Sequence, residues 1–77
     1  MNICFQIDET GLVVACVAAK MPVSYAEGRG VCFPRADAPE IDVMAAPHGY
    51  ADGDFFVVAL NEDGAPILDE SGKVVPA

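Results

Sequence analysis

The sequence has no tryptophan, one histidine and few basic residues, and it contains no long apolar run. Its longest uninterrupted apolar run, Leu12 to Ala19, is eight residues, whereas a helix needs about 20 apolar residues to span a bilayer. A membrane-spanning helix is therefore excluded. No basic residue precedes Ile3 and no long apolar block follows it, so the pattern of a secretory signal is missing. We expect a protein that is not secreted by a signal peptide.

Basic residues are scattered as well as scarce. Four lysines and arginines stand against twelve acidic residues, and the net charge is −8. Nucleic acid binding needs clustered Lys and Arg to displace counterions from phosphates, and an anionic lipid surface repels an acidic chain. We therefore expect neither nucleic acid nor a membrane as a partner. The acidity is typical of a chain kept soluble by its net charge. It also leaves open a small acidic inhibitor, or nucleic-acid mimic, that binds a basic host protein.

The three cysteines are an odd number, which excludes a complete set of intrachain disulfides. Cys4, Cys16 and Cys32 are 12 and 16 residues apart, and these spacings fit no zinc site built from close Cys pairs. Without a secretory signal we expect a reducing compartment, where free thiols behave as small buried hydrophobes. The sequence thus predicts free thiols, with redox or cross-linking chemistry as the alternative.

The apolar content is high for so short a chain. Apolar residues make up 53% of the 77 residues, and charged residues make up 21%. This composition excludes a disordered chain, because disorder accompanies low hydrophobicity. A chain of this length forms one small domain, residues 1–77, and it buries only about 60% of the surface that it exposes when unfolded. The core is therefore expected to be marginal on its own.

A short motif recurs near both ends of the chain. Ile7 to Ala15 (IDETGLVVA) matches Leu68 to Pro76 (LDESGKVVP), and Leu60 to Ile67 (LNEDGAPI) is a looser copy. In each copy an apolar residue precedes Asp or Asn, then Glu, a polar residue and Gly. The Asp or Asn side chain bonds back to the turn, and Gly supplies the positive φ that closes a three-residue loop with a bulge. The motif therefore predicts tight hairpin turns.

The first copy also predicts a register. The residues before the turn alternate in the way of a strand with one buried face. If the loop is the three residues Glu-Thr-Gly, Asp8 pairs with Leu12, and the numbers of paired residues sum to 20. Cys4 then lies opposite Cys16. The returning strand, Leu12–Val17, does not alternate, which predicts that this chain or another covers both of its faces.

The rest of the chain predicts short strands and no convincing helix, and its six prolines and seven glycines stand at turn positions. We expect an all-β fold, either a small antiparallel hairpin-based sheet or a partly open barrel or sandwich, with little or no helix. The further strands expected are Val31–Phe33, Pro39–Met44 and Asp54–Leu60, of which the last is the strongest, with turn material at Glu27–Gly30 and a loop at Ala45–Gly53.

Residues that could carry chemistry are few. His48 is the only histidine, and a pair with Cys32 would still need an orienting group and an oxyanion donor. Asp52 and Asp54 begin a calcium-loop spacing, but Phe56 stands at its third ligand position. We therefore expect no catalytic residue, no metal site and no cofactor, and we do not expect an enzyme.

Adjacent aromatic residues in the strongest strand predict an interface. Phe55 and Phe56 point to opposite faces if both lie in one strand, so one of them must enter a second core or meet a partner. Val14 lies in the strand that does not alternate. Because the chain has more apolar residues than a small core can bury, we expect an oligomer or a subunit of an assembly, with Val14, Phe55 and Phe56 as interface residues.

Four features together resemble small bacteriophage and prophage tail-fibre-associated proteins. They are the IDETGLVV hairpin, the proline-rich middle, the HGYADGDFF block at His48–Phe56 and the NEDGAPI turn at Asn61–Ile67. The resemblance implies a structural or assembly protein of a phage particle, tail- or capsid-associated, that contacts itself or other virion subunits without catalysis. It also implies a location in the virion or the bacterial cytoplasm, and it carries no catalytic residue to this chain.

Overall fold

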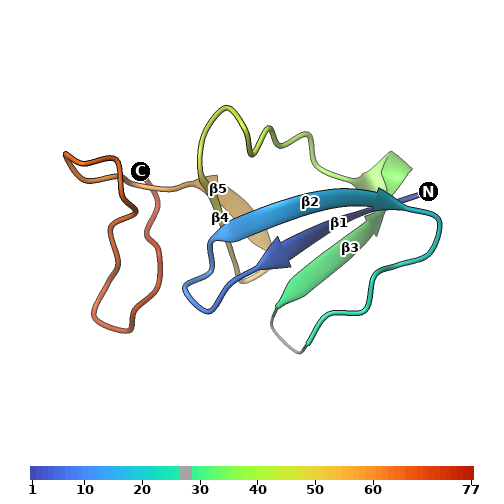
Figure 1. Ribbon diagram of the computed structural model, residues 1–77, viewed down its shortest axis with the longest axis horizontal. Helices are drawn as coiled ribbons and strands as arrows, with labels where there is room; N and C mark the ends of the chain where they lie inside the picture. Colours follow the sequence, from blue (N-terminus) through green and yellow to red (C-terminus); the bar gives the residue numbers. More distant parts are fainter. Residues whose placement is uncertain (27–28) are drawn as a thin grey trace.

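The computed structural model describes residues 1–26 and 29–77. A three-stranded antiparallel sheet and a separate two-stranded hairpin form an open, elongated all-β structure (Figure 1), which confirms the expected fold class. No helix among the described residues is long and apolar enough to cross a membrane. The elements in chain order are β1 (Asn2–Ile7), β2 (Val13–Ala19), β3 (Gly30–Pro34), the 3-10 turn η1 (Arg35–Asp37), β4 (His48–Ala51) and β5 (Asp54–Val57).

β1 is the central strand of the larger sheet. It pairs antiparallel with β2 on one side and with β3 on the other. Successive side chains of a strand point to opposite faces, so Phe5 and Ile7 share one face while Cys4 lies on the other. Phe5 and Cys4 are both fully buried. The alternation in the sequence predicts one buried face for this strand, but the strand has buried side chains on both faces.

The β1–β2 hairpin keeps the expected register only beside its turn. Ile7 pairs with Val13, as a sum of 20 requires. A β-bulge then leaves Val14 as an extra residue, so Cys4 pairs with Val17 instead of the second cysteine. One inserted residue shifts every later pair by one. The prediction that the first two cysteines are cross-strand neighbours is therefore wrong.

The expectation of three free thiols is also wrong. Cys4 forms a disulfide with Cys32 of β3, and the Cα atoms of the pair are 4.1 Å apart. The two residues are directly opposite each other in the β1–β3 ladder. Cys16 alone is free, and its side chain is exposed on β2. The pairing depends on β3 returning to the side of β1 that faces away from β2, which the spacing of the cysteines does not indicate.

The segment between β3 and β4 differs from the expectation in two places. Pro39–Met44 was predicted to be a strand, but it forms a loop. Oδ1 of Asp42 accepts hydrogen bonds from the N–H groups of Met44 and Ala45, at 3.0 and 3.1 Å, and so closes a turn in place of a ladder. Ala45–Gly53 was predicted to be a loop, but it contains β4, which pairs with β5. The turn expected at Glu27–Gly30 includes two residues outside the described part.

The main core lies between the three-stranded sheet and the elements that cross one of its faces. Phe5, Ile7 and Val13 are its buried centre. Partly buried side chains from β3, the loop before β4 and the β4–β5 hairpin pack against them, including Phe33, Ile41, Val43, Tyr50 and Phe55. Most of this core therefore consists of side chains that are brought together from distant parts of the sequence.

The three copies of the sequence motif form three matching turns. In each, Oδ1 of the first residue accepts hydrogen bonds from the N–H groups two and four residues later, at 2.8 and 3.1 Å for Asp8, 2.9 and 3.1 Å for Asn61, and 2.9 and 3.0 Å for Asp69. The glycine of each turn has a φ between +80° and +86°, a region that glycine adopts without strain. The predicted turn chemistry is confirmed in all three.

The tip of the first hairpin is held by residues from β4 and from the C-terminal segment. The N–H of Val74 donates to the carbonyl of Thr10 at 2.8 Å, and the N–H of Tyr50 donates to the carbonyl of Gly11 at 2.9 Å. Leu12 forms an isolated bridge with Gly49 at the start of β2. β4 therefore covers the outer side of β2 at this one end.

Candidate interaction surface

The histidine and the cysteine that could have formed a catalytic pair have other partners. Cys32 is held in the disulfide with Cys4, so it has no thiolate to act as a nucleophile. Nδ1 of His48 lies 2.9 Å from the carbonyl oxygen of Ala46, just before β4. Within residues 1–26 and 29–77, no group of three or more His, Cys, Asp and Glu side chains is placed to hold a metal ion.

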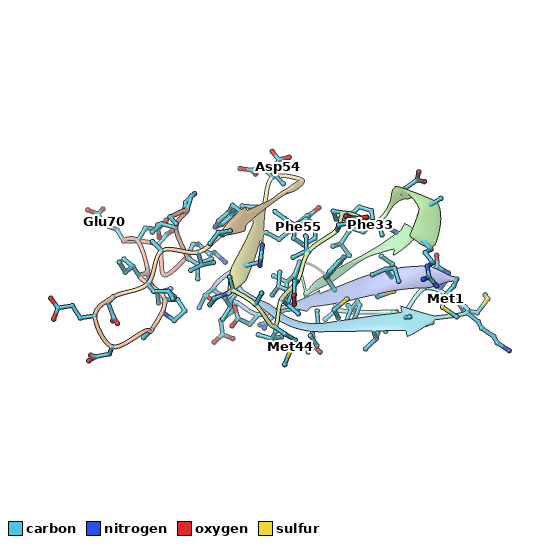
Figure 2. All side chains as sticks on the ribbon, turned by 90° about the horizontal axis from the view of Figure 1, so that it is seen from above. Met1, Phe33, Met44, Asp54, Phe55 and Glu70 are labelled. Carbon is cyan, nitrogen blue, oxygen red and sulfur yellow. A yellow bond between two sulfur atoms is a disulfide. The ribbon has the colours of Figure 1, made fainter. Side chains whose placement is uncertain are left out.

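Phe55 belongs to an aromatic cluster beside the main core. Its ring centroid is 4.9 Å from that of Phe5, 6.2 Å from that of Phe33 and 4.7 Å from that of Tyr50. The rings are tilted by 53° to 58°, an arrangement that aromatic pairs favour. Figure 2 shows Phe55 and Phe33 close together between the hairpin and the sheet. Phe55 is therefore half-buried by its own chain.

Phe56 packs in a different place, against the C-terminal segment. A Cβ atom at Gly49 would lie 2.6 Å from Cζ of Phe56 and 2.9 Å from Cγ2 of Val74, so only glycine fits between these side chains. Val74 is buried, as is Val58, which bridges to Pro76 of the same C-terminal segment. The two phenylalanines thus contact different groups within this chain, and their role at an interface stays a prediction.

An open groove runs beside β5. Its volume is 560 Å³, and its apolar lining comes from β3, β5 and the loop before β4. Asp37 and Asp54 add carboxylates to the lining, and Figure 2 shows Asp54 projecting at the tip of the β4–β5 hairpin. The aromatic and aliphatic side chains that line the groove are Phe33, Ile41, Phe55, Phe56 and Val57.

β2 is the most exposed apolar strand. Val14 is 49% exposed and Val17 is 44% exposed. Cys16, which lies between them, and Ala18, which follows Val17, are also exposed. The part of the chain that the structure describes does not supply the expected cover on both faces of this strand. Of the three residues predicted at an interface, Val14 is the one with a side chain open to solvent, because the bulge places it outside the ladder.

Exposed apolar side chains outnumber buried ones in the described part of the chain. The buried apolar residues are Cys4, Phe5, Ile7, Val13, Val58 and Val74. The exposed large hydrophobic residues are Met1, Val14, Val17, Met21, Val23, Met44, Val57, Leu60, Ile67 and Leu68. Met44, at 92% exposed, was not foreseen from the sequence. Its signal was Asp42, a turn-forming residue that holds Met44 outside any strand.

The carboxylates lie mostly in turns and loops, and two of them have a lowered pKa. Partial burial raises the pKa of Asp8, but hydrogen bonds from the hydroxyl and N–H of Thr10 and from the N–H of Leu12 outweigh it, with help from the charge of Arg29. The hydroxyl of Ser71 is the main cause of the lowered pKa of Asp69. These charges hold turns together and do not converge on a common site.

Comparison of the chain with protein-family models, with curated proteins and with solved structures finds no match.

Proposed function

We propose that this protein is a structural or assembly component that works through protein–protein contacts, and that its setting is a bacteriophage particle. The observation that carries the proposal is the excess of exposed over buried large apolar side chains. Large exposed apolar patches mark protein interaction sites on soluble proteins. The setting in a phage particle depends on the resemblance of the hairpin, the HGYADGDFF block and the NEDGAPI turn to tail-fibre-associated proteins.

The distribution of the exposed residues supports contacts with more than one neighbour. Val14 and Val17 lie on β2, whereas Leu60, Ile67 and Leu68 lie on the C-terminal turns at the other end of the molecule. Figure 1 shows these two regions at separate places along the long axis. A subunit that must join two neighbours needs separate apolar surfaces of this kind.

The test is made in the phage or prophage that encodes the chain. Deletion of its gene is expected to lower the yield of intact, infectious particles, and a tagged copy is expected to restore that yield. Variants with charges on either region, Val14→Asp or Leu68→Asp, are expected to restore it less well than Ser24→Asp, which changes an exposed residue outside both regions. Normal particle yield after deletion would refute the proposal. It would also be refuted if the tagged chain bound a basic host protein and had no effect on particle assembly.

A further inference from the structure

Among residues 1–26 and 29–77, no strand of the sheet lies beyond the outer edge of β2, which leaves backbone groups there without a neighbouring strand. The N–H of Ile7 donates to the carbonyl of Arg29, at 2.7 Å, on the β3 side of the sheet. Alternate residues of an antiparallel strand direct their backbone groups to opposite neighbours. The odd-numbered residues of β1 therefore bond toward β3 and the even-numbered residues toward β2. Since Cys16 and Ala18 are opposite odd-numbered residues, their N–H and C=O groups point outward from the sheet.

Beyond the bulge at Val14, this edge lacks the features that usually prevent strands from pairing. Natural edge strands carry a charge or a proline, or another element covers them. β2 has neither a charged residue nor a proline from Val13 to Ala19, although Lys20 follows it. Among the described residues, β4 covers this edge only at Leu12. The other edge, β3, contrasts with it, because β3 ends in Pro34 and is flanked by Arg29 and Arg35.

We propose that β2 pairs antiparallel with β2 of a second copy of this chain, around a two-fold axis at Cys16, so that the two sheets join into one of six strands. In this register both valines of residues 14–18 lie opposite an alanine. Val14 faces Ala18 of the second copy, and Ala15 faces Val17 of the second copy. Large side chains thus meet small ones along the whole ladder. Cys16 faces itself, and its outward N–H and C=O groups bond to those of its counterpart.

The charge distribution permits a second copy to approach this edge more readily than the acidic turns. Each copy carries a net charge of −8, but residues 10–26 contain no carboxylate. Two copies that meet along β2 therefore bring together segments that carry no negative charge.

The two-fold geometry also limits the contact along β2 to two copies. A two-fold contact uses the same patch on both partners and leaves no β2 edge open. The free edges of the six-stranded sheet are then the two copies of β3, which proline and arginine protect. This dimer deepens the proposed function, on which it rests for its biological role, by naming the first partner of the β2 surface.

Cross-linking at Cys16 tests the register directly. Cys16 is the one thiol outside the disulfide, and directly opposite residues in a ladder have Cβ atoms about 4.5–5.5 Å apart. A bis-alkylating thiol reagent with a span of about 5 Å is expected to convert the wild-type protein to a covalent dimer at high micromolar concentration. The double variant Cys16→Ser with Ser24→Cys, whose thiol is exposed outside β2, is expected to pair in the same way but to give no covalent dimer under the same treatment.

A second pair of variants tests the hydrogen-bonded edge. Ala18→Pro removes an outward N–H and leaves the β1 ladder intact, so we expect a folded monomer by light scattering and circular dichroism. Ala18→Lys, which adds a charge to the edge, is expected to give the same result if the proline variant does not fold. A monomeric wild-type chain, or a dimer that both variants retain, would overturn the inference. If such a chain still supported particle assembly, the proposed function would stand without the dimer.

Discussion

Asp8, Asn61 and Asp69 occupy equivalent positions in three turns, and they differ in charge. Each supplies one oxygen that accepts two main-chain hydrogen bonds. Asn61 needs no negative charge to do so, which indicates that the acceptor oxygen forms the turn and that ionisation adds to its strength. The chain therefore contains its own neutral reference for the two charged turns.

The pH dependence of stability tests this comparison at Asp8. Because its pKa is lower in the folded state than the usual value of about 3.9, the ionised carboxylate stabilises the fold above that pH, and this contribution is lost as the pH falls through the folded-state pKa. We expect Asp8→Asn, which keeps the acceptor, to reduce the loss of unfolding free energy in acid. Asp8→Ala should cost about 1–2 kcal/mol near neutral pH. Urea unfolding at neutral and acid pH measures both.

The reciprocal variant is the control. Asn61→Asp is expected to add an acid-sensitive contribution where the wild-type protein has none, because its oxygen would gain a charge in the same geometry. Equal loss of stability in acid for the wild-type protein and Asp8→Asn would contradict the assignment.

Local elements of the fold could be predicted from the sequence, and long-range ones could not. The turn at Asp8, the strands β1 and β3 and the start of β5 follow from alternation and turn chemistry, which involve near neighbours. The sequence does not indicate the bulge at Val14, because valine is common both in regular strands and at irregular strand positions. β4 was missed because its short run of His, Gly, Tyr and Ala has little strand character, and its pairing with β5 makes it a strand.

The interface residues show the same division. Val14 was singled out from the absence of alternation, and it is exposed. Phe55 and Phe56 were singled out from their adjacency, but the sequence does not indicate that Phe5, Tyr50 and Gly49 surround them. Which apolar residues a chain covers with its own segments depends on tertiary contacts, and a local pattern carries no information about these.

The disulfide is the element-scale feature with the largest expected effect on stability. Cys4 and Cys32 are separated by 28 residues, and a closed loop of this size is worth about 3–4 kcal/mol in the chain-entropy model. We expect a reductant to lower the free energy of unfolding by that order, whereas Cys16→Ser should leave the effect of the reductant unchanged. Alkylation of the denatured, unreduced protein should label one thiol, as found by mass spectrometry. Labelling of three thiols would show that the pair is not oxidised.

At the scale of the molecule, the apolar surface of β2 lies apart from the negative charge, whereas Leu60, Ile67 and Leu68 stand among the acidic residues of the C-terminal turns. Acidic residues concentrate in the turns and loops, whereas β2 and its flanking segments have none. The net charge keeps copies apart at long range, and the uncharged edge permits contact at short range. A chain with a small core can in this way stay soluble and still associate through a chosen strand.

This separation predicts that salt strengthens the association of two copies. Each chain carries a charge of −8, so repulsion between the chains opposes the dimer, while the proposed contact along β2 contains no ion pair that salt could weaken. The Debye length falls from about 30 Å at 0.01 M salt to about 10 Å at 0.1 M, and we expect the dimer dissociation constant to fall several-fold over this range. Sedimentation equilibrium across a salt series measures it, with Ala18→Lys as the monomeric control. Contacts between an acidic surface and a basic partner weaken as salt rises, so a dimer that dissociates at the higher salt concentration would show that charge attraction, and not the apolar edge of β2, holds the copies together.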